Sequence, residues 1–382
     1  MTAPAIFLLG TLGVGGSERK VVRIANALAS EGRPVQLAWL GGADTLLTEI
    51  ASDVVVSPLF RQGKYSIPAL RRLIGLLRRT RPCVLVNVNF YPMVYSAPAR
   101  ALTGSDVRLL ASINTTDLRG TRESRFMHFY APLLRHMDTV IFGAYAQAES
   151  WQSTFKIDAQ RSKVIHNGVD TDYFQPPSPA VRSRIRARLG LPEPAAVAVC
   201  VAQLRPEKAH GDLLEAFARC DVSTARLVLV GDGPLRDELK RQAKELGLED
   251  RILFAGEVTD VRPFLAAADL FALSSMAVET FSNAALEASA TGLPVVMTDI
   301  GGARELVDEG ASGLVVPPRN PAALAAALED LLRDQARCAR MGELGRARTV
   351  AAFGFGRMLA EWVSVLWEEG GVVASRPPQQ VA

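Results

Sequence analysis

The chain has 382 residues, of which 48% are hydrophobic and 22% charged, with a formal net charge of +3 and only four cysteines. This length predicts two domains, and the interspersed apolar and charged residues exclude a disordered chain. The scattered cysteines lack the spacing of a metal or redox site and are typical of free thiols in a reducing cytoplasm.

The first half of the chain alternates strand and helix patterns. Residues 6–9 form an apolar run, residues 13–16 a glycine-rich turn, and residues 18–31 carry apolar side chains at helical spacing. Further strands are expected at 35–39, 84–88, 108–113 and 139–142, and a further helix at 69–79. Such alternation predicts a parallel sheet with helices on both faces.

The second half repeats this pattern. Strands are expected at 197–201, 226–230, 252–255, 270–273 and 294–298, with helices between them such as 213–218 and 236–246. The proline-rich stretch 175–194 predicts the join, and residues from 370 onward are expected to be disordered. The fold class is therefore α/β, with two Rossmann-like domains that face a central cleft beyond the carboxyl ends of their strands.

Charge is distributed unevenly between the two halves. Residues 1–190 hold 24 Lys and Arg against 13 Asp and Glu, whereas residues 191–382 hold 19 against 27. The basic half fits an anionic acceptor, an anionic membrane surface or the acidic half of the same chain. The segment 71–79 is basic and amphipathic, and Arg119, Arg122 and Arg125 extend its charge. It fits either a lipid surface or a helix packed on its sheet with its arginines in water.

Two glutamates stand at a junction between a strand, a loop and a helix. Residues 281–283 open the helix that follows the strand at 270–273, so their free N–H groups and the helix dipole form an anion site. Glu279 lies just before this end, within reach of a ligand hydroxyl, and Glu287 lies one to two turns inside, where an acidic side chain can hold ribose. The alternative is an ordinary amphipathic helix with two solvated glutamates.

This region resembles the family 4 retaining glycosyltransferases of GT-B fold. The similarity runs through residues 268–270, 279–294 and 301–307, Gly310, Gly313 and residues 315–317, and in weaker form through most of residues 5–369. It implies that Glu279 contacts the donor sugar and Glu287 the nucleotide ribose. It also implies that the backbone between them meets the sugar and phosphate, at Phe281, Ser282 and Asn283.

The resemblance also implies the domain plan. An acceptor-side domain is expected at 1–175 and a nucleotide-sugar-binding domain at 176–354. A helix at 355–369 is expected to cross back onto the N-terminal domain, ahead of the disordered tail 370–382.

Two cations follow the strand at 197–201. Arg205 and Lys208 in this loop can neutralise a diphosphate as it departs, which removes the need for a metal ion. A solvated loop is the alternative. The resemblance implies that Lys208 holds the donor diphosphate, whereas the arginine of many members falls at Gln203 rather than at Arg205.

Glycines in the turn 13–16 allow a ligand to approach the backbone closely. The resemblance places Gly15 and Gly16 on the floor of the cleft, near the donor phosphates and the acceptor. The acidic residue that NAD binding requires about 20 positions further on is missing, which argues against NAD. Contacts to the donor base are expected from the backbone near Val258.

Two positions depart from the family pattern. Where many members carry a histidine that faces the donor sugar, this chain offers Asn114 or Asp117, and the usual serine after the strand at 139–142 is Gly143. Asp170 and Asp172 resemble a metal-binding pair of acids, but they lie beside the linker and are interpreted as structural. We therefore expect no metal.

These features predict a retaining hexosyltransferase that needs neither metal nor cofactor and acts in glycan, polysaccharide or glycolipid synthesis. A UDP-sugar is favoured over a GDP-sugar as donor, and the acceptor is a glycan, a lipid-linked molecule or a small molecule. Nucleic acid is not expected, because no aromatic platform accompanies the arginines. We find no secretory signal and expect a cytoplasmic protein, with peripheral membrane contact as one option. The catalytic candidates are Glu279, Lys208, Arg205 and Asn114.

Two alternatives to this function stay open. The departures at the histidine and arginine positions also fit a non-catalytic subunit that binds sugar nucleotides. The second alternative is a sugar-nucleotide epimerase of GT-B fold, which interconverts free nucleotide sugars without an acceptor.

Overall fold

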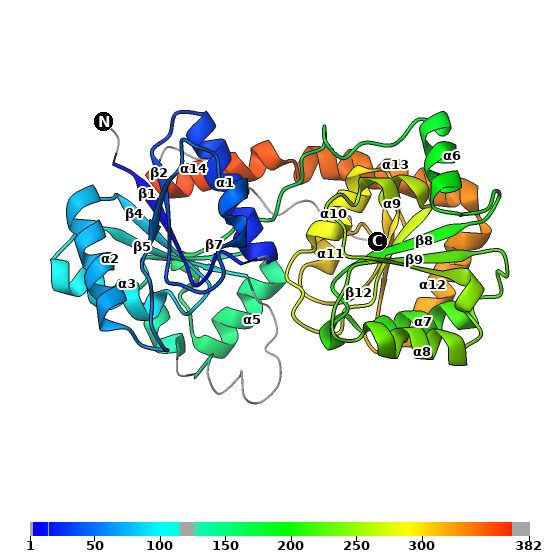
Figure 1. The fold of residues 1–382 in the computed structure, drawn as a ribbon, viewed down its shortest axis with the longest axis horizontal. Helices are drawn as coiled ribbons and strands as arrows, with labels where there is room; N and C mark the ends of the chain where they lie inside the picture. The colour runs from blue at the N-terminus through cyan, green and yellow to red at the C-terminus, as the bar shows by residue number, and fades with distance from the viewer. Residues whose placement is uncertain (1–2, 14, 115–126, 129, 369–382) are drawn as a thin grey trace. The chain divides into compact units, whose positions relative to one another are not determined.

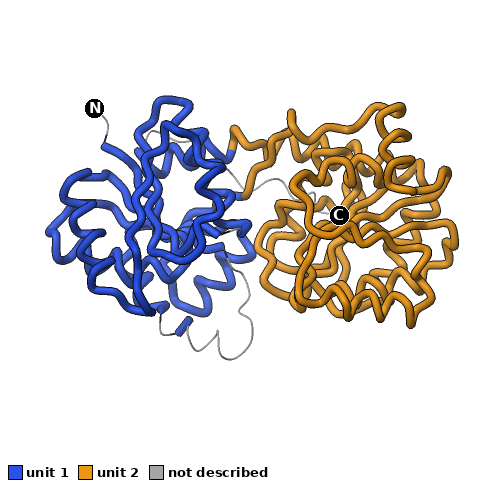
Figure 2. The backbone as a smooth tube through the Cα atoms, viewed as in Figure 1, with its two compact units in different colours: residues 1–166, 358–374 blue, residues 167–357, 375–382 orange. Residues whose placement is uncertain are grey.

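The computed structural model describes residues 3–13, 15–114, 127–128 and 130–368. The predicted disordered tail, Asp117 and the three arginines at 119, 122 and 125 lie outside these described residues. The chain divides into two compact units (Figures 1 and 2). Unit 1 holds the described residues up to His166 and those from Met358 onward, and unit 2 holds Asn167–Arg357.

In the described part of unit 1, seven parallel strands form a sheet with the order β3-β2-β1-β4-β5-β6-β7. The strands are β1 (Ala5–Leu9), β2 (Val35–Trp39), β3 (Val55–Pro58), β4 (Val84–Val88), β5 (Arg108–Ile113), β6 (Thr139–Phe142) and β7 (Ser162–Val164). The helices and short turns are α1 (Gly16–Ser30), η1 (Thr45–Glu49), α2 (Ile67–Thr80), α3 (Met93–Thr103), η2 (Ala131–His136), α5 (Tyr145–Phe155), η3 (Ala159–Arg161) and α14 (Phe355–Trp367).

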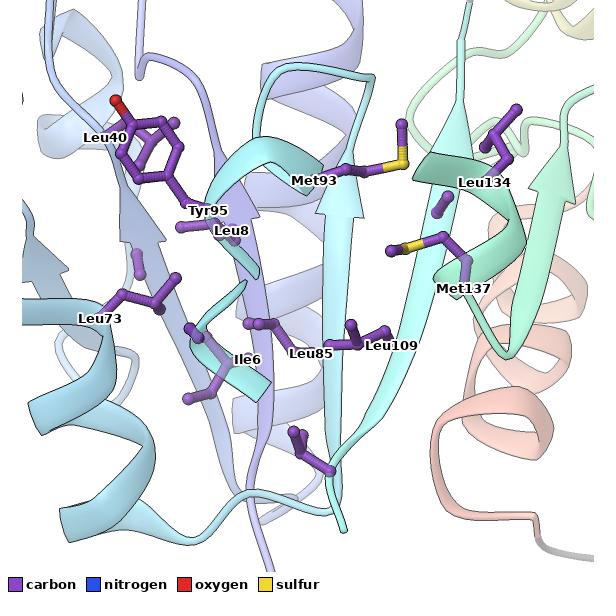
Figure 3. Packing of buried hydrophobic residues seen from close by; sticks show 14 of the residues in the cluster. Ile6, Leu8, Leu40, Leu73, Leu85, Met93, Tyr95, Leu109, Leu134 and Met137 are labelled. Atoms are coloured by element: carbon purple, nitrogen blue, oxygen red, sulfur yellow. The ribbon is translucent and has the colours of Figure 1, made fainter. Parts of the chain in front are cut away.

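The sheet of unit 1 is covered on both faces, as its fully apolar central strand requires. All five residues of β1 are completely buried. Because side chains alternate along a strand, Ile6 and Leu8 point to the face that carries α2 and α3, whereas Phe7 points the other way. Figure 3 shows the first of these faces, with side chains from β1, β4 and β5 meeting those of α2 and α3.

The last helix described, α14, packs on the other face of this sheet. The Trp362 ring lies 5.6 Å from the Phe7 ring, centroid to centroid. Arg108 at the start of β5 donates to the carbonyl oxygen of Leu366 at 2.5 Å, and the Trp367 indole donates to the Ala3 carbonyl at 3.3 Å. The chain therefore returns to unit 1 after completing unit 2.

In the described part of unit 2, six parallel strands form a sheet with the order β10-β9-β8-β11-β12-β13. The strands are β8 (Val197–Val201), β9 (Arg226–Val230), β10 (Ile252–Gly256), β11 (Leu270–Leu273), β12 (Val295–Thr298) and β13 (Gly313–Val316). The helices and turns are α6 (Pro179–Arg188), η4 (Pro206–Lys208), α7 (His210–Arg219), α8 (Arg236–Glu245), η5 (Glu249–Arg251), α9 (Arg262–Ala267), α10 (Asn283–Ala290), α11 (Ala303–Leu306), α12 (Pro321–Arg333) and α13 (Gln335–Ala352).

Both sheets share one topological feature. The chain begins at an inner strand, runs out to one edge, and then returns to start the other side, so that β1 lies beside β4 and β8 lies beside β11. At these two switch points the loops after neighbouring strands lead away to opposite faces, and ligands of such sheets bind there. The predicted pair of Rossmann-like domains is confirmed.

The proline-rich stretch predicted as the join is part of unit 2. Arg186 of α6 is 3% exposed, and its guanidinium donates to the carboxylate of Asp269 at 2.7 Å and to the Ala267 carbonyl at 2.8 Å. Asp269 also accepts from the Val197 amide at 2.7 Å and pairs with Arg182. This network fastens α6 to the start of β8 and of β11, and the two units divide before it, between His166 and Asn167.

We predict that Asp269→Asn lowers the free energy of unfolding by about 3 kcal/mol, because it removes the buried carboxylate that pairs with Arg186 and leaves only the exposed Glu193, 3.1 Å away, as a counter-charge. The matched control is Asp330→Asn, which removes an exposed partner of Arg337 and is expected to change the value by less than about 1 kcal/mol. Urea unfolding of the full chain, followed by far-UV circular dichroism, measures both. Equal midpoints for the wild type and Asp269→Asn would contradict this role.

Candidate functional site

The switch point of unit 2 brings together two of the residues that the sequence singled out. Lys208 ends the turn η4 after β8, and Glu279 lies in the loop after β11. The Lys208 ammonium and the Glu279 carboxylate form an ion pair, with side chains 23% and 13% exposed. Ser275 donates its hydroxyl to the same carboxylate oxygen at 3.0 Å. A cation and an anion from neighbouring strands thus meet, largely shielded from water.

Hydrogen bonds fasten these two loops to each other. The Ser274 hydroxyl lies 2.9 Å from the carbonyl oxygen of Lys208 and 3.0 Å from that of Ala209. The amide of Met276 donates to the carbonyl of Glu207 at 2.9 Å. The backbone that carries Lys208 is therefore fixed by the loop that carries Glu279.

A third loop supports Glu279 from the strand β12. The Gly302 amide donates to the Thr280 carbonyl at 2.7 Å. Gly301 has a φ of +58°, and a Cβ there would lie 2.3 Å from the Glu279 carbonyl oxygen, so only glycine fits. Val278 has a φ of +65°, which is strained for a β-branched residue. Such local strain is typical of loops whose position is imposed by function.

The helix α10 begins where residues 281–283 predict it. Ser282 is its N-cap and accepts from the Ala285 amide at 3.2 Å. The Phe281 ring is buried against Phe353, 5.2 Å away, and the Phe281 carbonyl accepts from the Asn167 side chain at 2.7 Å. Asn283 and Glu287 are half-buried along the first turns. Their contacts to a donor stay predictions.

Arg205 differs from Lys208 in its surroundings. It is exposed, as is Gln203, and its guanidinium makes no hydrogen bond or ion pair with the residues that the structure describes. Its carbonyl accepts from the Lys208 amide at 3.0 Å, so it stands at the start of the same turn. Val258 is half-buried in the loop after β10.

Two glycines that sequence reasoning missed shape this loop. A Cβ on Gly231 would lie 2.1 Å from the Ala202 carbonyl oxygen, and one on Gly233 would lie 2.5 Å from that of Leu204. These glycines let the loop after β9 press against the segment that leads to Arg205. The signal was the run Gly-Asp-Gly-Pro at 231–234, whose dipeptides mark a tight turn.

Two buried titratable groups adjoin the Lys208–Glu279 pair. Burial, with a contribution from Lys208, lowers the pKa of His210 to about 4. Burial raises the pKa of the Cys200 thiol to about 12. Both groups are therefore neutral near pH 7, and the charge here comes from the ion pair.

The switch point of unit 1 holds a second polar cluster. Gly15 is the N-cap of α1 and Gly16 its first residue. The Lys20 ammonium donates to the side-chain oxygen of Asn114 at 2.5 Å. The Asn114 amide nitrogen in turn donates to the Asn89 side-chain oxygen at 3.3 Å. Sequence reasoning singled out Asn114 but missed Lys20 and Asn89.

The acids beside the linker close a turn. The Asp170 carboxylate accepts from the amides of Asp172 and Tyr173, at 3.0 and 2.9 Å. Across the described residues, no three His, Cys, Asp or Glu side chains are grouped to hold a metal ion. Within the same residues, every helix is too short or too polar to cross a membrane.

Comparison with known proteins places this architecture in a family. The model described as "Glycosyltransferase Family 4" matches residues 14–173, and that described as "Glycosyl transferases group 1" matches residues 181–348. The GDP-mannose-dependent alpha-(1-6)-phosphatidylinositol monomannoside mannosyltransferase of Mycobacterium tuberculosis is 34% identical over 290 residues, which cover 72% of this chain and 70% of the relative.

Two further proteins extend the comparison. The lipopolysaccharide core biosynthesis mannosyltransferase LpsB of Rhizobium meliloti is 32% identical over 305 residues, covering 75% of this chain and 81% of the relative. The crystal structure of HepE from Anabaena in complex with UDP-glucose has a TM-score of 0.79 and 25% identity, covering 95% of this chain and 99% of that one. The chain therefore belongs to family 4 of the glycosyltransferases and is an enzyme of GT-B fold.

Proposed function

We propose that this enzyme transfers mannose from GDP-mannose to a hydroxyl of a lipid-linked or lipopolysaccharide-type acceptor, with retention at the anomeric carbon and without a metal ion. The observation that carries the proposal is the Lys208–Glu279 ion pair at the switch point of unit 2. It offers a cation for a diphosphate and a carboxylate for sugar hydroxyls at the edge of the sheet where nucleotides bind.

The similar proteins point to two different donors, a UDP-sugar and GDP-mannose. The sequence alone favours a UDP-sugar, and HepE is a structure with UDP-glucose at 25% identity. The mycobacterial relative is named for GDP-mannose at 34% identity, and LpsB is also named a mannosyltransferase. Because these two relatives share more of the sequence, we assign GDP-mannose. UDP-glucose is the alternative donor, and an experiment must distinguish it from GDP-mannose.

Charge development explains the roles of the cations. When the bond from the sugar carbon to the phosphate oxygen breaks, both electrons stay with the departing nucleoside diphosphate. A fixed ammonium stabilises that growing charge, and the exposed Arg205 adds a guanidinium from the same turn. Two such cations supply what a bound metal ion supplies in other transferases, which supports a reaction without metal.

Retention requires the acceptor to attack from the side that the diphosphate leaves. The acceptor oxygen then forms a bond to the sugar carbon, and its proton passes to an oxygen of the departing phosphate. Glu279 is better suited to orient the sugar than to attack it, because one of its oxygens already accepts from Lys208 and Ser275. Glu287, further along α10, is the acidic residue that we assign to the ribose hydroxyls.

An exposed apolar patch on unit 1 supports a lipid-linked acceptor. Phe60 and Tyr65, between β3 and α2, and Ile67, the first residue of α2, are 62%, 58% and 66% exposed, and we call them the apolar patch. The guanidinium of Arg72 lies 5.5 Å from the Phe60 ring centre, and Arg71 is exposed beside it on α2. Apolar rings flanked by arginines suit the interface of an anionic membrane, where a lipid-linked acceptor resides.

We predict that Lys208→Met weakens GDP binding at least tenfold, a loss of roughly 1.5–3 kcal/mol for a hydrogen bond to a charged group. Calorimetric titration of the purified chain with GDP and UDP, each with magnesium and with EDTA, measures this. The control is Lys244→Met, which removes an exposed lysine of the same unit. Tight UDP binding with no GDP binding would reject GDP-mannose, and a need for magnesium would reject the metal-free reaction.

We predict that the two glutamates separate binding from turnover. Glu287→Gln should weaken GDP and GDP-mannose alike, by about tenfold, because it removes a charged acceptor from the ribose. Glu279→Gln should lower the rate of sugar release about tenfold to a hundredfold while GDP binds as well or better, since Lys208 is freed for the diphosphate. GDP released from GDP-mannose gives the rate. If the two variants behave alike, these roles are wrong.

We predict that the double change Phe60→Ser with Ile67→Ser reduces binding to anionic vesicles at least tenfold, because it removes apolar area from the membrane interface. Sedimentation with phosphatidylglycerol–phosphatidylcholine vesicles measures the bound fraction. Leu344→Ser, at a position of unit 2 that is 56% exposed, is the matched control. If the double variant sediments with vesicles as the wild type does, the apolar patch does not contact the membrane.

A further inference from the structure

The polar cluster at the switch point of unit 1 consists of Lys20, Asn89 and Asn114. Lys20 lies on α1, Asn89 follows β4 and Asn114 follows β5, so three separate segments meet. The Asn89 side-chain oxygen accepts from the Asn114 backbone amide at 3.1 Å as well as from its side chain. The Asn89 amide donates to the Ser112 carbonyl at 2.8 Å, which fixes its own backbone.

These contacts set the orientation of the Asn114 side chain. Its amide nitrogen donates to Asn89 and, at 3.2 Å, to the Ser112 carbonyl, so both of its hydrogens are used within the unit. Its oxygen therefore faces Lys20 and accepts from the ammonium. An ammonium has three donors, and this bond uses one. Counting the contacts of the described residues, Lys20 rather than Asn114 is left with donors for a ligand.

The described residues compensate the charge of Lys20 poorly. Its side chain is half-buried, and among the described residues it forms no ion pair within 4.0 Å. Glu18 on the same helix acts on it at longer range, and its hydrogen-bond partner among the described residues is the neutral side chain of Asn114, which Asn89 holds in place. A half-buried ammonium in this setting gains free energy when an anion binds beside it.

We propose that Lys20 binds a phosphate group of the acceptor, and that Asn114 and Asn89 are positioning residues that hold its ammonium. This rests on the proposed transferase function. The donor diphosphate has its own cations in unit 2, at Lys208 and Arg205, so the cation at the switch point of unit 1 is available to the second substrate. Lysine binds phosphate as a compact point charge, which suits a site with one ammonium on neutral supports.

The first test observes Lys20 directly. The chain has only seven lysines, so labelling each Cε with carbon-13 gives few NMR signals, and Lys20→Met assigns the one of interest. Burial lowers the pKa of Lys20 to about 8, against the weaker opposing effect of Glu18. Adding myo-inositol 1-phosphate should raise that pKa, whereas myo-inositol should not. A signal that titrates at its ordinary value, or that ignores the phosphate ester, overturns the proposal.

The same signal tests the positioning role of Asn114. Asn114→Leu removes the acceptor of the Lys20 hydrogen bond, so the pKa of Lys20 should fall further below about 8. A residue that only maintained the fold would leave this pKa unchanged in a folded variant. An unchanged value therefore counts against the proposed network.

The second test compares affinities by calorimetry in the full chain. Lys20→Met should weaken myo-inositol 1-phosphate at least tenfold and leave GDP binding unchanged, while Lys163→Met, an exposed lysine of the same unit, should alter neither. Weaker GDP binding in Lys20→Met would assign the lysine to the donor phosphate instead. If GDP fails to bind the wild type, the proposed function fails; if only the phosphate ester is insensitive to Lys20, this inference alone fails.

The pH dependence supplies an independent readout. Because Lys20 loses its proton as the pH rises through about 8, binding of the phosphate ester should weaken between pH 7 and 9. Lys20→Arg keeps its charge throughout this range and should bind without that decline. A decline of equal size in the arginine variant would show that another group causes it.

Discussion

The order of the strands is the constraint on which the functional geometry depends. In each sheet the chain leaves an inner strand for one edge and later returns to that strand's other side, so two loops from distant parts of the sequence meet. In unit 2 this brings Lys208 next to Glu279, which are far apart in the chain. In unit 1 it brings Lys20 to Asn114. The chemistry of both units therefore depends on topology before it depends on any single side chain.

The contacts around Glu279 show how the loops that meet at the switch point are held rigid. The loop after β12 approaches so closely that Gly301 has no room for a side chain, and the Gly302 amide holds the Thr280 carbonyl. Val278 accepts an unfavourable backbone conformation in the same loop. Packing and hydrogen bonds elsewhere offset that local cost. The carboxylate is thus placed by three neighbouring strands rather than by its own flexible chain.

Apolar runs in the sequence were sufficient to predict the inner strands of both sheets. The strands they missed, β3, β7 and β13, all lie at sheet edges, where one side is unpaired and the apolar pattern is weaker. Val55 of β3, for example, is 59% exposed. A central strand that is buried on both faces requires a continuous run of apolar residues, which is easy to recognise in a sequence. An edge strand does not require such a run.

The candidate site was predictable in unit 2 and largely hidden in unit 1. Glu279, Glu287 and Lys208 lie in segments whose residue types and spacing mark a strand, a loop and a helix, and they also match a family pattern. Lys20 is one of several charged residues on an amphipathic helix, and nothing in its spacing distinguishes it from a solvated lysine. Only the fold shows that its ammonium turns toward the end of β5.

The ion pair in unit 2 also bears on which anions the enzyme tolerates in a crowded cell. Because the Glu279 carboxylate already neutralises the Lys208 ammonium, a ligand gains little by offering a single weak charge. Chloride or a lone inorganic phosphate must compete with a carboxylate held in place by Ser275. A nucleoside diphosphate brings more charge and, under the proposed role of Glu287, a second point of attachment through its ribose. In the proposed role of Lys208, the pair would therefore discriminate against abundant small ions and in favour of the whole donor.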